Sequence, residues 1–220
     1  VDSSRTSLEG FGSTFKFGRS SKKRLQFETS VTVRTPGLEF NDIGFMRRSD
    51  VIHHGTWVAY YLRDPFLIFR NFYLNTNYWM YWNFSGKLTG TYLNTNFNSE
   101  FKNRWRINGN ITRESETIST SLLRGGPSFI SPGSEEMNLN LRTDPSKKLS
   151  FASGTYQGFG DVKSYREQAY WGGINYKPTN GLSFSLEPEY FSQVNRLQYV
   201  GTYYNLNDPR YVFAEISQKT

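Results

Sequence analysis

The chain has 220 residues, enough for one β domain or two small ones, and its lack of cysteine excludes a disulfide framework and a thiolate metal site. Its formal net charge is +7, but the Lys and Arg residues are scattered along the chain, so we expect no nucleic-acid partner. Its apolar runs are far shorter than the ~20 residues of a membrane-spanning helix, which argues against a helical membrane protein but not against alternating membrane strands.

The first predicted element is a β-hairpin. Residues 10–18 carry Phe11, Phe15 and Phe17 at odd positions, and residues 25–33 carry mostly apolar side chains at odd positions and polar ones at even positions. Successive side chains of a strand point to opposite faces of the sheet, so this pattern predicts one apolar and one polar face. Pro36-Gly37 ends the second strand.

Residues 35–50, TPGLEFNDIGFMRRSD, are poor material for a strand although they lie between two predicted strands. A segment of this length that is neither a short turn nor a strand is usually functional or packed by its own side chains. We expect it to fold over or into the end of a barrel, with Arg47 or Arg48 paired to Asp42 or Asp50 and with Phe40 and Phe45 packed inward. The candidate residues of this folded connection are Asn41, Asp42, Phe45, Arg47, Arg48 and Asp50.

Residues 57–62 and 66–84 form the most aromatic region of a chain in which 17% of the residues are aromatic. Arg63-Asp64-Pro65 predicts a turn between them. The rings gather toward the expected strand ends, as they do in the aromatic girdles of membrane barrels at the lipid–water boundary. The alternative is a platform on which sugar rings stack. Just before this region, His53 and His54 are neighbours in a strand, so they point to opposite faces and cannot share a metal ion without a bend.

Residues 101–112 show the clearest alternation of the chain. Odd positions carry largely apolar side chains, including Trp105 and Ile107, while even positions carry cationic and polar ones, including Arg104 and Arg106. A helix would mix these residues, so the pattern predicts a strand that pairs with residues 86–98 through Ser99-Glu100. We expect the odd side chains to face lipid and the even ones to face a lumen.

The remaining sequence predicts further strands with one apolar and one polar face. Residues 114–123 begin a strand, and residues 125–134 are rich in Gly and Pro and predict a loop. Strands follow around Met137, Leu149, Tyr170 and Leu182, with a hairpin turn at residues 178–181. We count about 12 to 14 strands of roughly 9–13 residues, the length that a tilted bilayer-spanning strand needs.

No constellation of side chains predicts an enzyme. Glu187 and Glu189 share one face of a predicted strand at a separation of ~7 Å, which glycoside hydrolysis could use, but such pairs are common on polar strand faces. No cofactor motif is present. The candidate lumen-facing residues are Lys102, Arg104, Arg106, Arg142, Glu187 and Glu189.

Several short motifs resemble the barrel domain of unknown function of Bacteroidota outer-membrane proteins that carry an N-terminal family-9-like carbohydrate-binding domain. The matching residues are Pro36-Gly37, Glu39, Asn41-Asp42, Gly44-Phe45, Arg47-Arg48, Asp50, residues 101–105, residues 124–127 and residues 211–214. The resemblance implies an outer-membrane barrel and supplies no known activity. The resemblance also implies a carbohydrate-binding domain, which these 220 residues do not include, and further strands after the part that corresponds to residue 220.

The sequence therefore predicts an all-β protein: residues 1–220 form a single antiparallel transmembrane β-barrel domain that is part of a larger barrel. We expect it in the outer membrane of a Gram-negative bacterium, with the lipid bilayer, other envelope proteins or glycans as partners. Three functions remain open: a pore, transporter or anchor for a surface glycan-binding module; a non-conducting scaffold or partner subunit of an envelope assembly; and a soluble, aromatic-rich carbohydrate-binding β protein.

Overall fold

The computed structural model describes residues 9–19, 23–40, 46, 48–205 and 208–220. The described chain is built from strands and one short 3-10 helix. These elements are β1 (Gly12–Arg19), β2 (Leu25–Arg34), β3 (Val51–Leu62), β4 (Phe69–Trp82), β5 (Leu88–Phe101), β6 (Arg106–Glu114), β7 (Thr117–Ser119), β8 (Phe129–Ser131), β9 (Ser134–Arg142), β10 (Leu149–Gly160), η1 (Asp161–Lys163), β11 (Tyr165–Thr179), β12 (Leu182–Leu186), β13 (Glu189–Asn205) and β14 (Asp208–Lys219).

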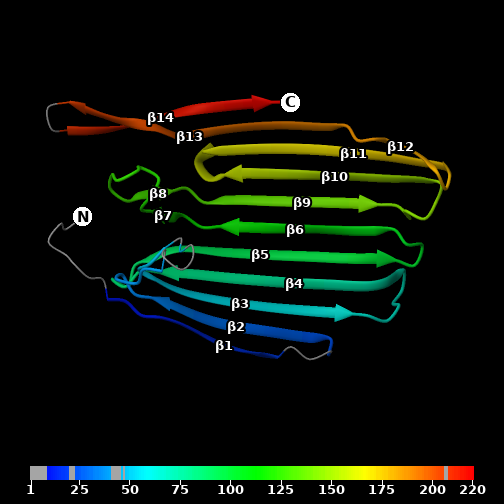
Figure 1. Ribbon diagram of the computed structural model, residues 1–220, viewed down its shortest axis with the longest axis horizontal. Helices are drawn as coiled ribbons and strands as arrows, with labels where there is room; N and C mark the ends of the chain where they lie inside the picture. Colours follow the sequence, from blue (N-terminus) through cyan, green and yellow to red (C-terminus); the bar gives the residue numbers. More distant parts are fainter. Residues whose placement is uncertain (1–8, 20–22, 41–45, 47, 206–207) are drawn as a thin grey trace.

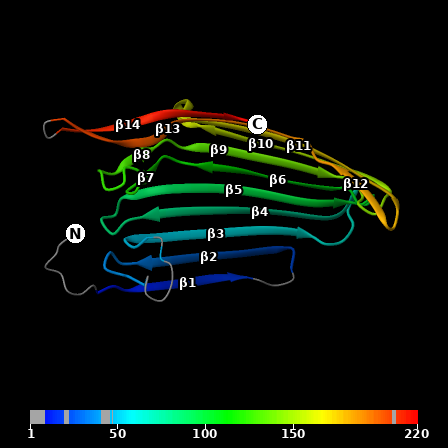
Figure 2. The ribbon, with the colours of Figure 1, turned by 45° about the horizontal axis from the view of Figure 1, so that its top comes forward.

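Twelve of the strands form one antiparallel sheet in the order β1-β2-β3-β4-β5-β6-β9-β10-β11-β13-β14, in which β12 and β13 both pair with β11 (Figure 1). The hairpin β7–β8 is inserted between β6 and β9 and forms a separate two-stranded sheet. The predictions of an all-β antiparallel fold and of about 12 to 14 strands are confirmed. The sheet is open: β1 and β14 lie at its opposite edges and do not pair with each other (Figure 2), so the described strands do not form a closed barrel.

The register of the strands gives the sheet two chemically different faces. Directly paired residues share a face, and from β1 to β12 one face carries mainly large apolar side chains. Many of these side chains are open to the surroundings: Phe15 is 69% exposed, Ile111 54% and Phe184 57%. We call this side of the sheet the apolar face. An apolar sheet face is normally covered by another layer, and no second layer covers this one in the described chain.

The opposite side, the polar face, is lined by hydroxyl, amide and charged side chains. At its centre lies an asparagine network, defined as Asn75, Asn77, Asn94, Asn96, Asn108, Asn138 and Asn140, on β4, β5, β6 and β9. The Oδ1 atom of Asn75 accepts hydrogen bonds from the Nδ2 atoms of Asn77 at 2.9 Å and Asn96 at 2.8 Å. Asn77 also donates to Asn94 at 3.0 Å, and Asn140 donates to Asn108 at 3.1 Å. The side-chain amide groups therefore form hydrogen bonds with one another across neighbouring strands.

The described residues contain little conventional core. The buried apolar side chains are Leu38, Val51, Ala59, Leu123, Ala169 and Tyr199. They do not form one cluster in sequence, since Leu38 and Leu123 lie in connections outside the strands, and no large side chain in the described ranges is completely buried. No helix in this part of the chain is long and apolar enough to cross a membrane.

The prediction of one strand over residues 101–112 is wrong, because β5 ends at Phe101 and β6 begins at Arg106. Between them the chain makes a tight turn, closed by hydrogen bonds from Phe101 N to Trp105 O at 2.8 Å and from Arg104 N to Phe101 O at 2.9 Å. Arg104 has φ = 67°, a left-handed conformation that usually falls to Gly or Asn. Asn103 is a residue that favours turns, and its Oδ1 accepts a hydrogen bond from Trp105 N at 3.1 Å. The left-handed position falls to Arg104, and the alternation of residues 101–105 does not mark a continuous strand.

Two further boundaries differ from the predictions. Residues 114–123 give only the three-residue strand β7, and the Gly- and Pro-rich segment 125–134 contains the three-residue strand β8. Glu187 and Glu189 do not share a strand, since Pro188 separates β12 from β13 and Glu187 lies in the link. Proline has no N–H group to donate to the ladder, which explains the break.

Candidate functional site

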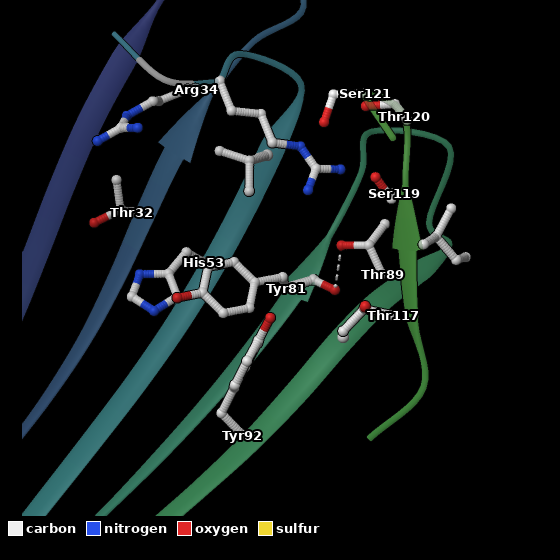
Figure 3. A pocket seen from close by; sticks show the side chains of 14 residues that line it. Thr32, Arg34, His53, Tyr81, Thr89, Tyr92, Thr117, Ser119, Thr120 and Ser121 are labelled. Atoms are coloured by element: carbon white, nitrogen blue, oxygen red, sulfur yellow. Dashed lines mark hydrogen bonds between the residues drawn. The ribbon is translucent and has the colours of Figure 1, made fainter. Parts of the chain in front are cut away.

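A pocket of about 550 Å³ lies on the polar face, at the end of the sheet where β2 ends and β5 begins. Its wall comes from β2, β3, β4 and β5, and its cover from β7 and the residues that follow (Figure 3). The lining residues are Thr32, Arg34, Arg48, Val51, His53, Tyr81, Thr89, Gly90, Tyr92, Thr117, Ile118, Ser119, Thr120 and Ser121.

The floor of the pocket is a row of side chains across four strands. Thr32 pairs with His53, His53 with Tyr81, and Tyr81 with Gly90. The His53 and Tyr81 rings stack with their centroids 4.5 Å apart and their planes 20° apart. Tyr92 meets Tyr81 edge-on at 5.7 Å. Packing of the three rings gives this part of the sheet a fixed aromatic surface.

The chain after β6 folds back over the polar face to cover this floor. Ser115 is linked to Thr91 of β5 by two hydrogen bonds, from Ser115 N to Thr91 O at 2.9 Å and from Thr91 N to Ser115 Oγ at 3.0 Å. Thr117 then lies against β5 at Gly90, where an added Cβ atom would be 2.8 Å from Thr117 Cγ2. Glycine at position 90 therefore lets β7 approach the sheet closely.

The polar groups of the pocket are two guanidinium groups and a set of hydroxyls. These guanidinium groups belong to Arg34 and Arg48, which both line the pocket. The hydroxyl of Thr89 donates to the backbone oxygen of Tyr81 at 3.1 Å. The Nε2 atom of His53 is buried and has no hydrogen-bond partner in the described part of the chain. No described acidic side chain lines the pocket, although Glu114 is the cross-strand neighbour of Tyr92 beside it.

His53 points to the polar face, whereas His54 points to the apolar face and lies 3.1 Å from the hydroxyl of Thr29. The prediction that the two side chains point to opposite faces is confirmed. In the sequence these histidines suggest only a test for metal ligation. The place of His53 in a pocket has no signal in the sequence, because the pocket depends on the register of four strands and on the position of β7.

The candidate residues of the connection 35–50 do not lie together at one site in the described structure. Asn41, Asp42, Phe45 and Arg47 lie outside the described residues. Arg48 lines the pocket, and Asp50 accepts a hydrogen bond from Phe84 N at 2.9 Å, which holds the β4–β5 turn. Asp50 and Arg48 form no ion pair with each other. Phe40 is 47% exposed, so the prediction that it packs inward is wrong.

The candidate lumen-facing residues cluster at the other end of the sheet. Arg106 and Arg142 are directly paired on the polar face. Glu100 accepts from Arg70 at 2.9 Å and lies 3.3 Å from Arg106, so a carboxylate balances part of this positive charge.

Arg142, Glu187 and Glu189 line a second pocket of about 510 Å³, next to Trp171. Lys102 and Arg104 lie apart from this pocket, exposed in the β5–β6 turn rather than on a strand wall.

The described fold defines a class of protein: an open antiparallel meander with one exposed apolar face and one polar face, with pockets on the polar side. The chain belongs to the family described as a domain of unknown function, DUF5916, whose model matches residues 1–220. The resemblance to a domain of unknown function is thus confirmed, while the bacterial group and the carbohydrate-binding neighbour stay expectations. No curated protein and no solved structure matches the chain.

Proposed function

We propose that the chain forms part of the wall of an outer-membrane β-barrel, with its apolar face against lipid and its polar face toward a water-filled lumen used for transport. The observation that carries the proposal is the exposed apolar face, which continues from β1 to β12 and is not covered by any of the residues that the structure describes. Exposed apolar surfaces of this extent mark membrane or protein contacts. Alternation of apolar and polar side chains along every wall strand is the pattern of membrane barrels.

The position of charge on the apolar face supports lipid as the covering medium. Between β2 and β11, the charged side chains on this face that the register assigns are Arg113, Glu135 and Arg166. Arg113 is the second-last residue of β6, and Glu135 and Arg166 are the second residues of their strands. Charges at strand ends reach the headgroup region, whereas charges near the bilayer centre are costly. A protein partner on the apolar face would not require the charged side chains to lie only near the strand ends.

Membrane barrels leave no lipid-exposed sheet edge, because unpaired backbone groups are costly in hydrocarbon. Under this proposal the β1 and β14 edges pair with further strands, from the same protein or from another copy. The resemblance adds the expectation that the complete protein presents a glycan-binding module at the bacterial surface. Transport through the lumen and anchoring of such a module are compatible activities.

A second candidate function is a scaffold with a closed lumen. The observation that favours it is β7, which packs on the polar face over Gly90 and covers part of what would be the channel. Planar-bilayer recording of the full-length protein separates the two functions. Stepwise ion conductance supports a pore, and an inserted protein without conductance supports the scaffold.

The membrane proposal itself is tested by extraction. The protein should leave the membrane fraction only with detergent and should show a β-type circular dichroism spectrum in micelles. A folded, stable monomer in plain buffer would overturn the proposal and support the third reading, a soluble carbohydrate-binding protein.

A further inference from the structure

We propose that the pocket beneath β7 binds an acidic sugar, with its carboxylate held by Arg34 and Arg48 and its hydroxyls held by the surrounding Thr and Ser side chains. This inference deepens the proposed transport function by naming a ligand class. It rests on that function only for its biological role, since the binding event itself can be measured in micelles.

The two guanidinium groups give the pocket its preference for an anion. Arg34 and Arg48 both line it, no described carboxylate does, and no ion pair engages either arginine within the described residues. Guanidinium groups stay charged and offer a planar set of donors that fits a carboxylate in a bidentate manner. Other arginines on the sheet already have carboxylate partners: Arg106 lies 3.3 Å from Glu100, and Arg113 lies 2.6 Å from Asp161.

The rest of the lining is suited to a polyhydroxylated ring. Hydroxyl groups come from both sides of the pocket, from the sheet and from its cover, and belong to Thr32, Tyr81, Thr89, Tyr92, Thr117, Ser119, Thr120 and Ser121. Each hydroxyl donates one hydrogen bond and accepts others, which matches the hydroxyls of a sugar. The stacked His53 and Tyr81 rings add an apolar surface for the C–H groups of the sugar ring.

Size favours a sugar acid over a small inorganic anion. A volume of about 550 Å³ lies within the usual range of small-molecule pockets. Inorganic phosphate would engage the arginines but leave most of the hydroxyl wall and the aromatic floor unused. A neutral sugar would form hydrogen bonds with the hydroxyl wall but would give the two guanidinium groups no anionic partner.

The test is calorimetric titration of the detergent-solubilised full-length protein with glucuronate, glucose, glucose 6-phosphate and inorganic phosphate. Glucuronate should bind, and glucose should bind at least tenfold more weakly. Arg34→Gln and Arg48→Gln should each weaken glucuronate binding by about tenfold to a hundredfold, the usual effect of losing a charged hydrogen bond. Arg→Lys at either site should restore part of the loss, since the charge remains without the bidentate geometry.

Lys87→Gln is the matched control, since it removes one positive charge from the exposed β4–β5 turn at the same end of the sheet without touching the pocket. It should leave glucuronate affinity unchanged. Equal binding of glucose and glucuronate, tighter binding of either phosphate ligand, or full affinity in both Arg→Gln variants would overturn the inference. If a variant fails to give a β-type spectrum, Thr120→Val serves instead, since Ser119 Oγ already accepts a hydrogen bond from Leu122 N in the cover. Weaker glucuronate binding is expected, and unchanged binding counts against the site. If the protein does not insert into membranes, the proposed function is overturned but the binding inference is not.

Discussion

Arg113 on β6 binds both carboxylate oxygens of Asp161 in η1, with Nη1 to Oδ1 at 2.9 Å and Nη2 to Oδ2 at 2.6 Å. The contact crosses β9, the strand between β6 and β10. The backbone N–H of Asp161 also donates to Gly133 O at 2.8 Å. A Cβ atom at position 133 would lie 2.7 Å from Asp161 Oδ2. One aspartate thus ties together the ends of β6, β9 and β10.

The first prediction concerns pH. The hydrogen bond from Arg113 is the main reason that the pKa of Asp161 lies below its ordinary value. A lowered pKa means that the contact stabilises the turn at pH values above the ordinary Asp range, and that this contribution is lost as the pH falls through the lowered pKa. The Asp161→Asn variant should therefore exchange amide hydrogens of residues 161–164 faster than wild type at pH 7.

The difference between wild type and Asp161→Asn should disappear at pH values below the lowered pKa of Asp161, because the wild-type carboxyl is then neutral as well. Hydrogen exchange followed by mass spectrometry, with both proteins at each pH, makes this comparison. A difference that persists unchanged in strong acid would show that the carboxylate charge does not hold the turn.

The second prediction concerns the two faces of β6. Ile111 lies on the apolar face near the middle of the strand, whereas its neighbour Asn110 lies on the polar face. Ile111→Arg should lower folding stability in lipid vesicles by roughly 2–4 kcal/mol if the position is near the bilayer midplane. Ile107→Arg, close to the strand end, should cost less. Asn110→Arg is the control and should cost little; equal losses at 110 and 111 would rule out a lipid-facing apolar side.

The third prediction concerns the asparagine network. Asn75 is 8% exposed, accepts from two other asparagines and donates to Tyr73 Oη at 2.6 Å. Asn75→Ala leaves these groups without their partner and should cost about 1–3 kcal/mol in urea unfolding. Asn98 is an exposed asparagine of β5 on the same polar face. Asn98→Ala should change the free energy of unfolding by no more than about 0.5 kcal/mol. Similar values for the two variants would mean that the network does not stabilise the sheet.

The fourth prediction concerns Gly154 and the indole that covers it. A Cβ atom at Gly154 would lie 2.2 Å from Cε2 and Cζ2 of Trp171, its directly paired residue. Gly154→Ala must displace the ring, which should cost about 1–3 kcal/mol and shift the tryptophan fluorescence. Gly172→Ala is the control on the opposite face, where the nearest atom, Pro188 Cγ, is 4.0 Å away. A fluorescence shift only in the Gly172 variant would contradict the packing described.

Alternation in the amino-acid sequence determined much of the fold. It was enough to predict the hairpin of β1 and β2 and the overall number of strands. Turn-forming residues, and not alternation, predicted the hairpin turn within residues 178–181 and the break after β3 at Arg63–Pro65, although the link there continues to residue 68. Such predictions succeed because side-chain direction in a strand depends only on position along the chain. The same logic separated His53 from His54 onto opposite faces.

Only the tertiary structure decided where the site lies. The tight turn at residues 102–105 has one local signal, Asn103, but it places Arg104 in a conformation that arginine rarely takes, and the surrounding alternation predicted a strand instead. The pocket needs Arg34, His53, Tyr81 and Tyr92 in register on four strands, and it needs the chain after Glu114 to turn back over Gly90. Strand register is set by pairing between distant segments, and a cover over a sheet is set by packing, so neither can be read from the periodicity of a single strand.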